Sequence, residues 1–170
     1  IRPLMESNRT GVGEYTYELL NALFKIDNDN QYFLFYNSNK DVSKNIPTWN
    51  NKNVHYIKFN WPNKLFNLFL LIFRHPKIDR LINQKLDYFF SPNMNFTALS
   101  KNVKHILTIH DLSFEYFPDC FGMKRRLWHK ILLPKYACQK ADIILTPSES
   151  TRQDVMEKYE IDGNKIKVIY

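Results

Sequence analysis

The stretch His105-Ile-Leu-Thr-Ile-His-Asp-Leu112 decides how this sequence folds. Residues 105–109 are mostly apolar and rich in β-branched side chains, which predicts a short strand buried on both faces. The polar pair His110-Asp111 follows directly where this strand ends. The same kind of short apolar run, rich in aromatic or β-branched residues, recurs at Gln31–Tyr36, Asn53–Phe59, Leu86–Phe90, Asp142–Leu145 and Lys165–Ile169.

Helical patterns fill the intervals between these strands. Pro76 is expected to break one of the helices, and Ser150 with Gln153 three residues later predicts a capping box in the last one. Alternating strands and helices imply right-handed crossovers, so the fold class is α/β: a Rossmann-like, mostly parallel sheet flanked by helices. The predicted helices span Val12–Lys25, Lys64–Lys85, Arg125–Ala141 and Ser148–Tyr159.

The expected domain organisation follows from the same alternation of strands and helices. Residues 1–170 are expected to form a single Rossmann-like domain. Only Ile1-Arg2 precedes the first loop, where a strand should stand, so we expect the first strand to be truncated. Tyr170 closes a strand, and the sequence is therefore interpreted as a fragment.

Composition limits the function classes. The chain has 170 residues, 44% of them hydrophobic and 15% aromatic, which suits a globular domain. Cys120 and Cys138 form no CxxC motif and suggest reduced thiols, and no signal peptide pattern opens the chain, so we expect a cytoplasmic protein. The formal charge of +7 favours anionic partners, although heavy use of Asn, Lys and Ile also fits a biased genome. No nucleic-acid reader motif is present, so nucleic acid is not expected as a partner.

Thr10-Gly11-Val12-Gly13 stands directly before a predicted helix. Two glycines let the backbone approach a ligand, and the amides at a helix start favour a phosphate or carboxylate. The alternative is a tight turn that only starts the helix. Because the chain has just four glycines, the pair favours the ligand interpretation.

Other candidate residues follow predicted strands. His110 could donate a hydrogen bond to a sugar hydroxyl or share developing charge, or it could be a capping or core histidine fixed by Asp111. Asn93, after Ser91-Pro92, could pair with sugar hydroxyls, although a proline-containing turn is the preferred interpretation of most of this loop. The histidines show no metal-binding spacing, so no metal is expected.

Two further segments leave alternatives open. Lys124-Arg125-Arg126 could clamp a phosphate or touch an anionic membrane, but a solvated charged face is commoner. The apolar segment Trp61–Phe73, flanked by cations, could lie in a membrane interface. The preferred interpretation is a helix that covers the sheet, because helices apolar nearly all round are usually buried.

In order and spacing, several short motifs together resemble the N-terminal domain of glycosyltransferase family 4, which has the GT-B fold. The resemblance covers nearly the whole chain and is closest to mannosyl- and rhamnosyl-type members. The matching pieces are Arg9–Thr16 (RTGVGEYT), Ser91–Asn93 (SPN), Thr108–Leu112 (TIHDL), Phe117-Pro118, Lys140–Asp142 (KAD), Thr146–Ser150 (TPSES) and Lys165–Tyr170 (KIKVIY).

The resemblance implies two facing Rossmann-like domains, of which this chain is the acceptor-side half and the nucleotide-sugar domain is absent. It further implies a retaining hexosyltransferase that uses no metal or other cofactor. Its donor would be a nucleotide-sugar and its acceptor a saccharide or a lipid-linked glycan. Apart from the resemblance, peripheral contact with the inner face of the cytoplasmic membrane is an open alternative to a purely cytoplasmic location. We expect the fragment to be inactive alone; the alternative is a non-catalytic module that docks on anionic membrane or phosphate ligands.

The resemblance also assigns residues. His110 corresponds to the catalytic histidine that contacts the donor sugar, and Gly13 is expected to converge with it on one groove. Gly11, Gly13 and Ser148 are expected on the donor side, with Ser148 in a structural role at a helix start. Acceptor contacts are expected from Arg9, Asn93, Asp111, Phe114 and Lys124.

Overall fold

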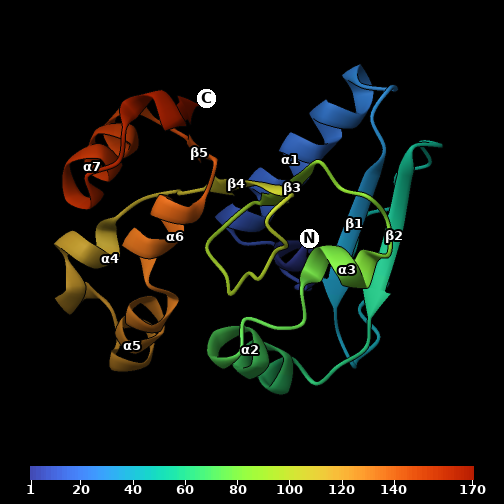
Figure 1. The fold of residues 1–170 in the computed structure, drawn as a ribbon, viewed down its shortest axis with the longest axis horizontal. Helices are drawn as coiled ribbons and strands as arrows, with labels where there is room; N and C mark the ends of the chain where they lie inside the picture. The colour runs from blue at the N-terminus through green and yellow to red at the C-terminus, as the bar shows by residue number, and fades with distance from the viewer. The chain divides into compact units, whose positions relative to one another are not determined.

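The computed structural model describes residues 1–170, which divide into two compact units (Figure 1). Unit 1 comprises Ile1–Lys85 and Thr97–Ser100, and unit 2 comprises Leu86–Phe96 and Lys101–Tyr170. Each unit holds its own parallel sheet and its own buried apolar cluster.

Unit 1 is built around a pair of parallel strands, β1 (Tyr32–Asn37) and β2 (Val54–Phe59), which run in register from Tyr32 opposite Val54 to Asn37 opposite Phe59. Its core gathers side chains from the 3₁₀ turn η1, from α1 and from both strands: Leu4, Leu20, Phe24, Leu34 and Val54. Its helical elements are η1 (Arg2–Met5), α1 (Gly11–Ile26), α2 (Asn63–Ile72) and α3 (Ile78–Ile82).

Unit 2 holds a four-stranded parallel sheet in the order β3-β4-β5-β6. The strands are β3 (Tyr88–Ser91), β4 (Lys104–Thr108), β5 (Ile143–Thr146) and β6 (Ile166–Val168). The helices are α4 (Ser113–Tyr116), α5 (Met123–Leu132), α6 (Pro134–Lys140) and α7 (Glu149–Tyr159), with 3₁₀ turns at Pro118–Cys120 and Gly163–Lys165.

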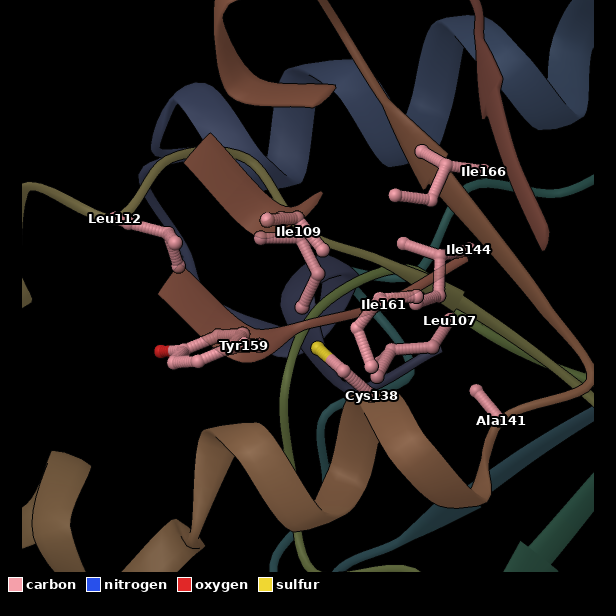
Figure 2. Packing of buried hydrophobic residues seen from close by; sticks show 10 residues of the cluster. Leu107, Ile109, Leu112, Cys138, Ala141, Ile144, Tyr159, Ile161 and Ile166 are labelled. Carbon is pink, nitrogen blue, oxygen red and sulfur yellow. The ribbon is translucent and has the colours of Figure 1, made fainter. Parts of the chain in front are cut away.

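The core of unit 2 lies where helices pack on this sheet. Figure 2 shows Cys138, carried by α6, among Leu107, Ile109, Ile161 and Tyr159. Burial raises the pKa of the Cys138 thiol to about 12, so the sulfur packs as a small apolar group. Both cysteines are free thiols.

The predicted α/β class with parallel strands is confirmed, and all six predicted strands are present, although they fall into two sheets. The break at Pro76 is also confirmed, because α2 ends before it and α3 begins after it. The prediction of one helix over Arg125–Ala141 is wrong. Leu133 takes a left-handed conformation (φ 50°) and Pro134 starts a new helix, since its fixed φ and missing N–H suit a first turn. None of the helices combines the length and apolar character needed to cross a membrane.

Candidate functional site

The candidate site of unit 2 lies at the carboxyl ends of β3, β4 and β5. These strands are parallel neighbours, so the loops that leave them start at the same edge of the sheet. The loops begin at Pro92, Ile109 and Pro147. This is the edge at which open α/β sheets bind ligands.

His110 is held firmly at this edge. Its Nε2 lies 2.8 Å from the Pro92 carbonyl oxygen, and because a carbonyl only accepts, Nε2 carries the proton in this contact. The residue before it, Ile109, is fully buried and donates its N–H to the Leu145 carbonyl at 2.9 Å, which extends the β4–β5 ladder. Leu112 is buried just beyond. The imidazole is therefore held by a hydrogen bond, and its loop is anchored by the buried residues Ile109 and Leu112.

Ser148 and Thr151 connect α7 to the same loop. The Ser148 hydroxyl accepts from the Thr151 N–H at 3.1 Å and caps α7. The Thr151 hydroxyl donates to the His110 carbonyl at 3.2 Å and lies 3.0 Å from the Ser148 hydroxyl. The predicted capping box at Ser150 is wrong, because the N-cap of α7 is Ser148, two residues earlier, and the helix begins at Glu149.

Replacing Ser148 with alanine removes this cap, since alanine leaves the Thr151 N–H without its acceptor. We expect the free energy of unfolding to fall by about 1 kcal/mol, a usual cost for losing an N-cap. Urea unfolding followed by circular dichroism measures the change. Ser150→Ala is the matched control and should unfold like the wild type; equal losses in both variants would contradict the assignment of the cap.

Asp111 and Phe114 shape the segment after His110. The Asp111 carboxylate accepts from the Ser113 N–H at 2.8 Å and from the Ser113 hydroxyl. Ser113 is the first residue of α4. The Phe114 ring stacks on the His129 imidazole with centroids 4.1 Å apart and planes 5° apart. Burial, and then the charge of Arg125, lower the pKa of His129, which favours the neutral ring in this stack. One face of Phe114 is therefore covered by α5.

The remaining candidates of unit 2 are less closely connected to His110. Asn93 accepts from the Asn95 side chain at 2.9 Å within its own loop. That loop is seated on α5 by Phe96, whose ring meets Trp128 edge-on with centroids 5.0 Å apart. Lys124 lies exposed on α5.

The other candidate residues lie in unit 1, at the start of α1. Thr10 forms no side-chain cap here, so the first-turn amides, from Gly11 to Gly13, have no capping side chain. Gly13 is buried, and a Cβ placed on it would lie 3.1 Å from the Pro3 carbonyl oxygen, so close packing alone favours glycine. At Gly11 a Cβ would meet nothing within 4 Å. Arg9 lies over the Tyr17 ring at 4.1 Å and 3.5 Å from Glu14.

The structure thus brings Pro92, His110, Ser148 and Thr151 together, with Asp111 adjoining them. Gly13 belongs to unit 1 and His110 to unit 2, and their convergence on one groove stays a prediction. Sequence reasoning missed Thr151 and His129. Thr151 could have been found from the sequence, because it is the third residue of α7, the position whose N–H an N-cap such as Ser148 accepts. The sequence offers no comparable signal for His129.

Parallel sheets with helices between their strands define a Rossmann-like α/β protein. The chain belongs to glycosyltransferase family 4, because the model of the family described as Glycosyltransferase Family 4 matches residues 9–170. The recognition made from the motifs is therefore confirmed.

A shorter match identifies one relative. A stretch of 64 residues, 38% of this chain, is 33% identical to the O-antigen chain mannosyltransferase RfbU of Salmonella typhimurium (strain LT2). The match spans 17% of that relative's length.

Proposed function

We propose that this chain is the acceptor-side half of a retaining glycosyltransferase. The enzyme transfers a hexose, of mannosyl type, from a nucleotide-sugar to a saccharide or lipid-linked acceptor in polysaccharide biosynthesis. Membership of the family over residues 9–170 supports the class of reaction. The observation that carries the proposal is the His110 imidazole, fixed at the carboxyl end of β4 by the Pro92 carbonyl 2.8 Å away.

In the proposed reaction the bond between the anomeric carbon and the donor phosphate breaks, and the acceptor hydroxyl attacks from the same face. The acceptor proton passes to the leaving phosphate oxygen. We assign His110 to the donor sugar, where a ring held in one orientation needs no reorganisation as charge develops. The Ser148–Thr151 pair positions it through its backbone carbonyl.

The start of α1 is the proposed site for the donor diphosphate. The amides of Gly11, Val12 and Gly13 carry the positive end of a helix of 16 residues, which favours an anion. This electrostatic stabilisation of a leaving diphosphate needs no metal or other cofactor.

The acceptor is assigned to polar and aromatic side chains of both units, each taken by itself. Asn93 and Asp111 follow neighbouring strands and offer an amide and a carboxylate to sugar hydroxyls. Phe114 offers the edge of its stacked ring, Arg9 its guanidinium and Lys124 its ammonium group. The free thiols of Cys120 and Cys138 agree with a reducing compartment, so we place the protein in the cytoplasm.

We further propose a second Rossmann-like domain in the complete protein that holds most of the nucleotide-sugar. Titration calorimetry with the nucleotide diphosphate should then give clear binding for the complete protein and at least about tenfold weaker binding for residues 1–170. Transfer of labelled sugar should occur only with the complete protein.

Tight nucleotide binding by residues 1–170 alone would contradict the proposal that a second domain binds most of the nucleotide-sugar. A complete protein that binds anionic ligands but transfers no sugar with any nucleotide-sugar donor would favour the non-catalytic docking module instead.

A further inference from the structure

One face of α7 contacts the segment from His110 to Glu115 at both of its ends. The buried residues of this helix are Thr151, Val155 and Tyr159, which are spaced four residues apart and so share one face. The Thr151 hydroxyl donates to the His110 carbonyl at 3.2 Å. At the other end of the helix, the Tyr159 hydroxyl donates to the Glu115 carboxylate at 2.9 Å. The same helix face therefore holds the segment at two points.

The Tyr159 side of this second contact is buried. The side chain is 3% exposed, and Figure 2 shows its ring beside Cys138 with the hydroxyl on the side away from that sulfur. Burial, and then the hydrogen bond to the Glu115 carboxylate, raise the pKa of the Tyr159 hydroxyl, so it stays protonated and remains a donor. A hydroxyl that donates to a carboxylate forms a stronger bond than one between two neutral groups.

Helix α4 is too short to hold its own place. It comprises four residues, and none of them is fully buried. A single helical turn is marginal by itself, because its few hydrogen bonds do not offset the ordering of the backbone. Its place depends on side-chain contacts: Phe114 stacks on α5, whereas Glu115 and Tyr116 contact α7. The Tyr116 ring lies 5.2 Å from the Lys158 ammonium group, and because both partners are exposed this pair contributes little. The bond of Glu115 to Tyr159 is therefore the main tie of α4 to α7.

The two ends of the held segment have different assignments in the proposed reaction. His110, at the start, is assigned to the donor sugar, and Phe114, near the end, is assigned to the acceptor. Phe114 directly precedes Glu115 in α4, so a shift of Glu115 moves the Phe114 ring as well. Thr151 thus fixes the donor end of the segment, and Tyr159 fixes the acceptor end.

We propose that Glu115 is a positioning residue for the acceptor: its carboxylate, held by the Tyr159 hydroxyl, keeps α4 in place and so fixes Phe114 and Asp111 where the acceptor sugar binds. A contact that is fixed beforehand needs less ordering when the ligand binds, which favours affinity. Glu115 acts through its neighbours and touches no reacting atom, so any side-chain oxygen that accepts from Tyr159 should serve. This role rests on the proposed transfer reaction.

Steady-state transfer by the complete protein, with each substrate varied in turn, tests the proposal. Glu115→Ala and Tyr159→Phe should each raise the acceptor KM about fivefold, the loss expected from one hydrogen bond, and leave the donor KM within about twofold. Tyr159→Phe keeps the aromatic ring in the core, and Glu115 is partly exposed, so both variants are expected to fold. Glu115→Gln keeps an oxygen that accepts from Tyr159 and should give an acceptor KM near the wild-type value.

Two control variants separate the ends of the segment. Thr151→Val acts at the His110 end, so it should lower the turnover number and leave the acceptor KM near the wild-type value. Lys158→Gln removes the exposed cation of α7 that contacts α4 and should leave both KM values unchanged. Amide hydrogen exchange of the complete protein adds a measurement that needs no substrate. Residues 113–117 should exchange faster in Tyr159→Phe than in the wild type, because α4 opens more often without its anchor.

Several outcomes would overturn the proposal. In a protein that transfers sugar, an acceptor KM that stays unchanged in both Glu115→Ala and Tyr159→Phe would remove the acceptor role of Glu115 and leave the proposed reaction intact. Unchanged hydrogen exchange of residues 113–117 would show that α4 keeps its place without the bond. A large loss of turnover in Glu115→Gln would assign the carboxylate to the reacting atoms. A wild-type protein that transfers no sugar would overturn the proposed reaction itself, and the acceptor role with it, whatever the hydrogen exchange shows.

Discussion

Replacing His110 with alanine is expected to lower the turnover number of the complete transferase about 100-fold, the usual cost of removing a fixed group that stabilises developing charge. The ring is fixed before substrate arrives, through Nε2 and the Pro92 carbonyl 2.8 Å away. Donor affinity should change much less than turnover, because the diphosphate is assigned to other groups. Steady-state transfer of labelled sugar, with the donor varied at saturating acceptor, separates the two effects.

A purely structural role for His110 predicts a different result. If the ring only holds the Pro92 loop in place, His110→Ala lowers the midpoint of urea unfolding. The turnover number of the folded variant then stays within a few fold of the wild-type value. His110→Asn serves as the second variant, because asparagine retains an N–H donor for the loop but not the imidazole. Normal turnover in folded His110→Ala would remove the catalytic assignment.

Thr151 provides a graded control. Thr151→Val removes the hydroxyl that donates to the His110 carbonyl at 3.2 Å while it keeps the branched shape of the side chain. Its effect on turnover should be clearly smaller than that of His110→Ala, because it acts only through the position of the loop.

Much of the fold could be predicted from the sequence because its signals are local. Runs such as Ile106–Ile109 are apolar and β-branched over the length of a strand, and the structure pairs them in parallel as expected. Pro134 was an equally local signal for a new helix, but the apolar spacing on both sides of it favoured one continuous helix. The division of the strands into two sheets depends on long-range pairing, for which no local pattern exists.

The sequence predicted those residues of the candidate site that directly follow a strand, and it did not predict those that tertiary packing brings near. His110, Asn93 and Ser148 follow strands in the sequence, and they lie at one edge because those strands are parallel neighbours. The stack of Phe114 on His129 could not be predicted, since it joins α4 to α5 through tertiary packing. The two-faced burial of α2 was hidden for the opposite reason: from Leu68 to Ile72 the helix carries only apolar residues, so no polar residue marks the exposed side there.

His105 is expected to make the protein lose stability as the pH falls from 6.5 toward 4. Burial lowers the pKa of this imidazole from 6.5 to about 4, against an opposing effect of the Asp142 carboxylate. In the unfolded chain the ring takes up a proton below pH 6.5, whereas the folded protein resists it until about pH 4. Unfolding is therefore favoured by acid across this window, and the full shift corresponds to roughly 3 kcal/mol.

The neighbouring strand β3 supplies part of the surroundings that bury the His105 ring. Its Nε2 lies 2.9 Å from the Ser91 hydroxyl of the neighbouring strand β3, and its ring lies against Phe89. Urea unfolding at a series of pH values should show the free energy of unfolding rising with pH between about 4 and 6.5. His105→Gln keeps a hydrogen-bonding group for Ser91 but cannot titrate, so its profile should be flatter by most of that amount.

Lys104→Gln is the matched control for this experiment. It removes a charge from the adjacent residue of β4, whose ammonium group lies 5.7 Å from the Tyr88 ring, and leaves the imidazole in place. Its profile should run parallel to that of the wild type. Other groups with lowered pKa values, such as the Ile1 amino group, Asp41, His129 and Glu160, are present in all three proteins and cancel in the comparison. A His105→Gln profile as steep as the wild-type profile would show that His105 is protonated at its ordinary pH in the folded protein, and that the strand edge beside Ser91 is open to water.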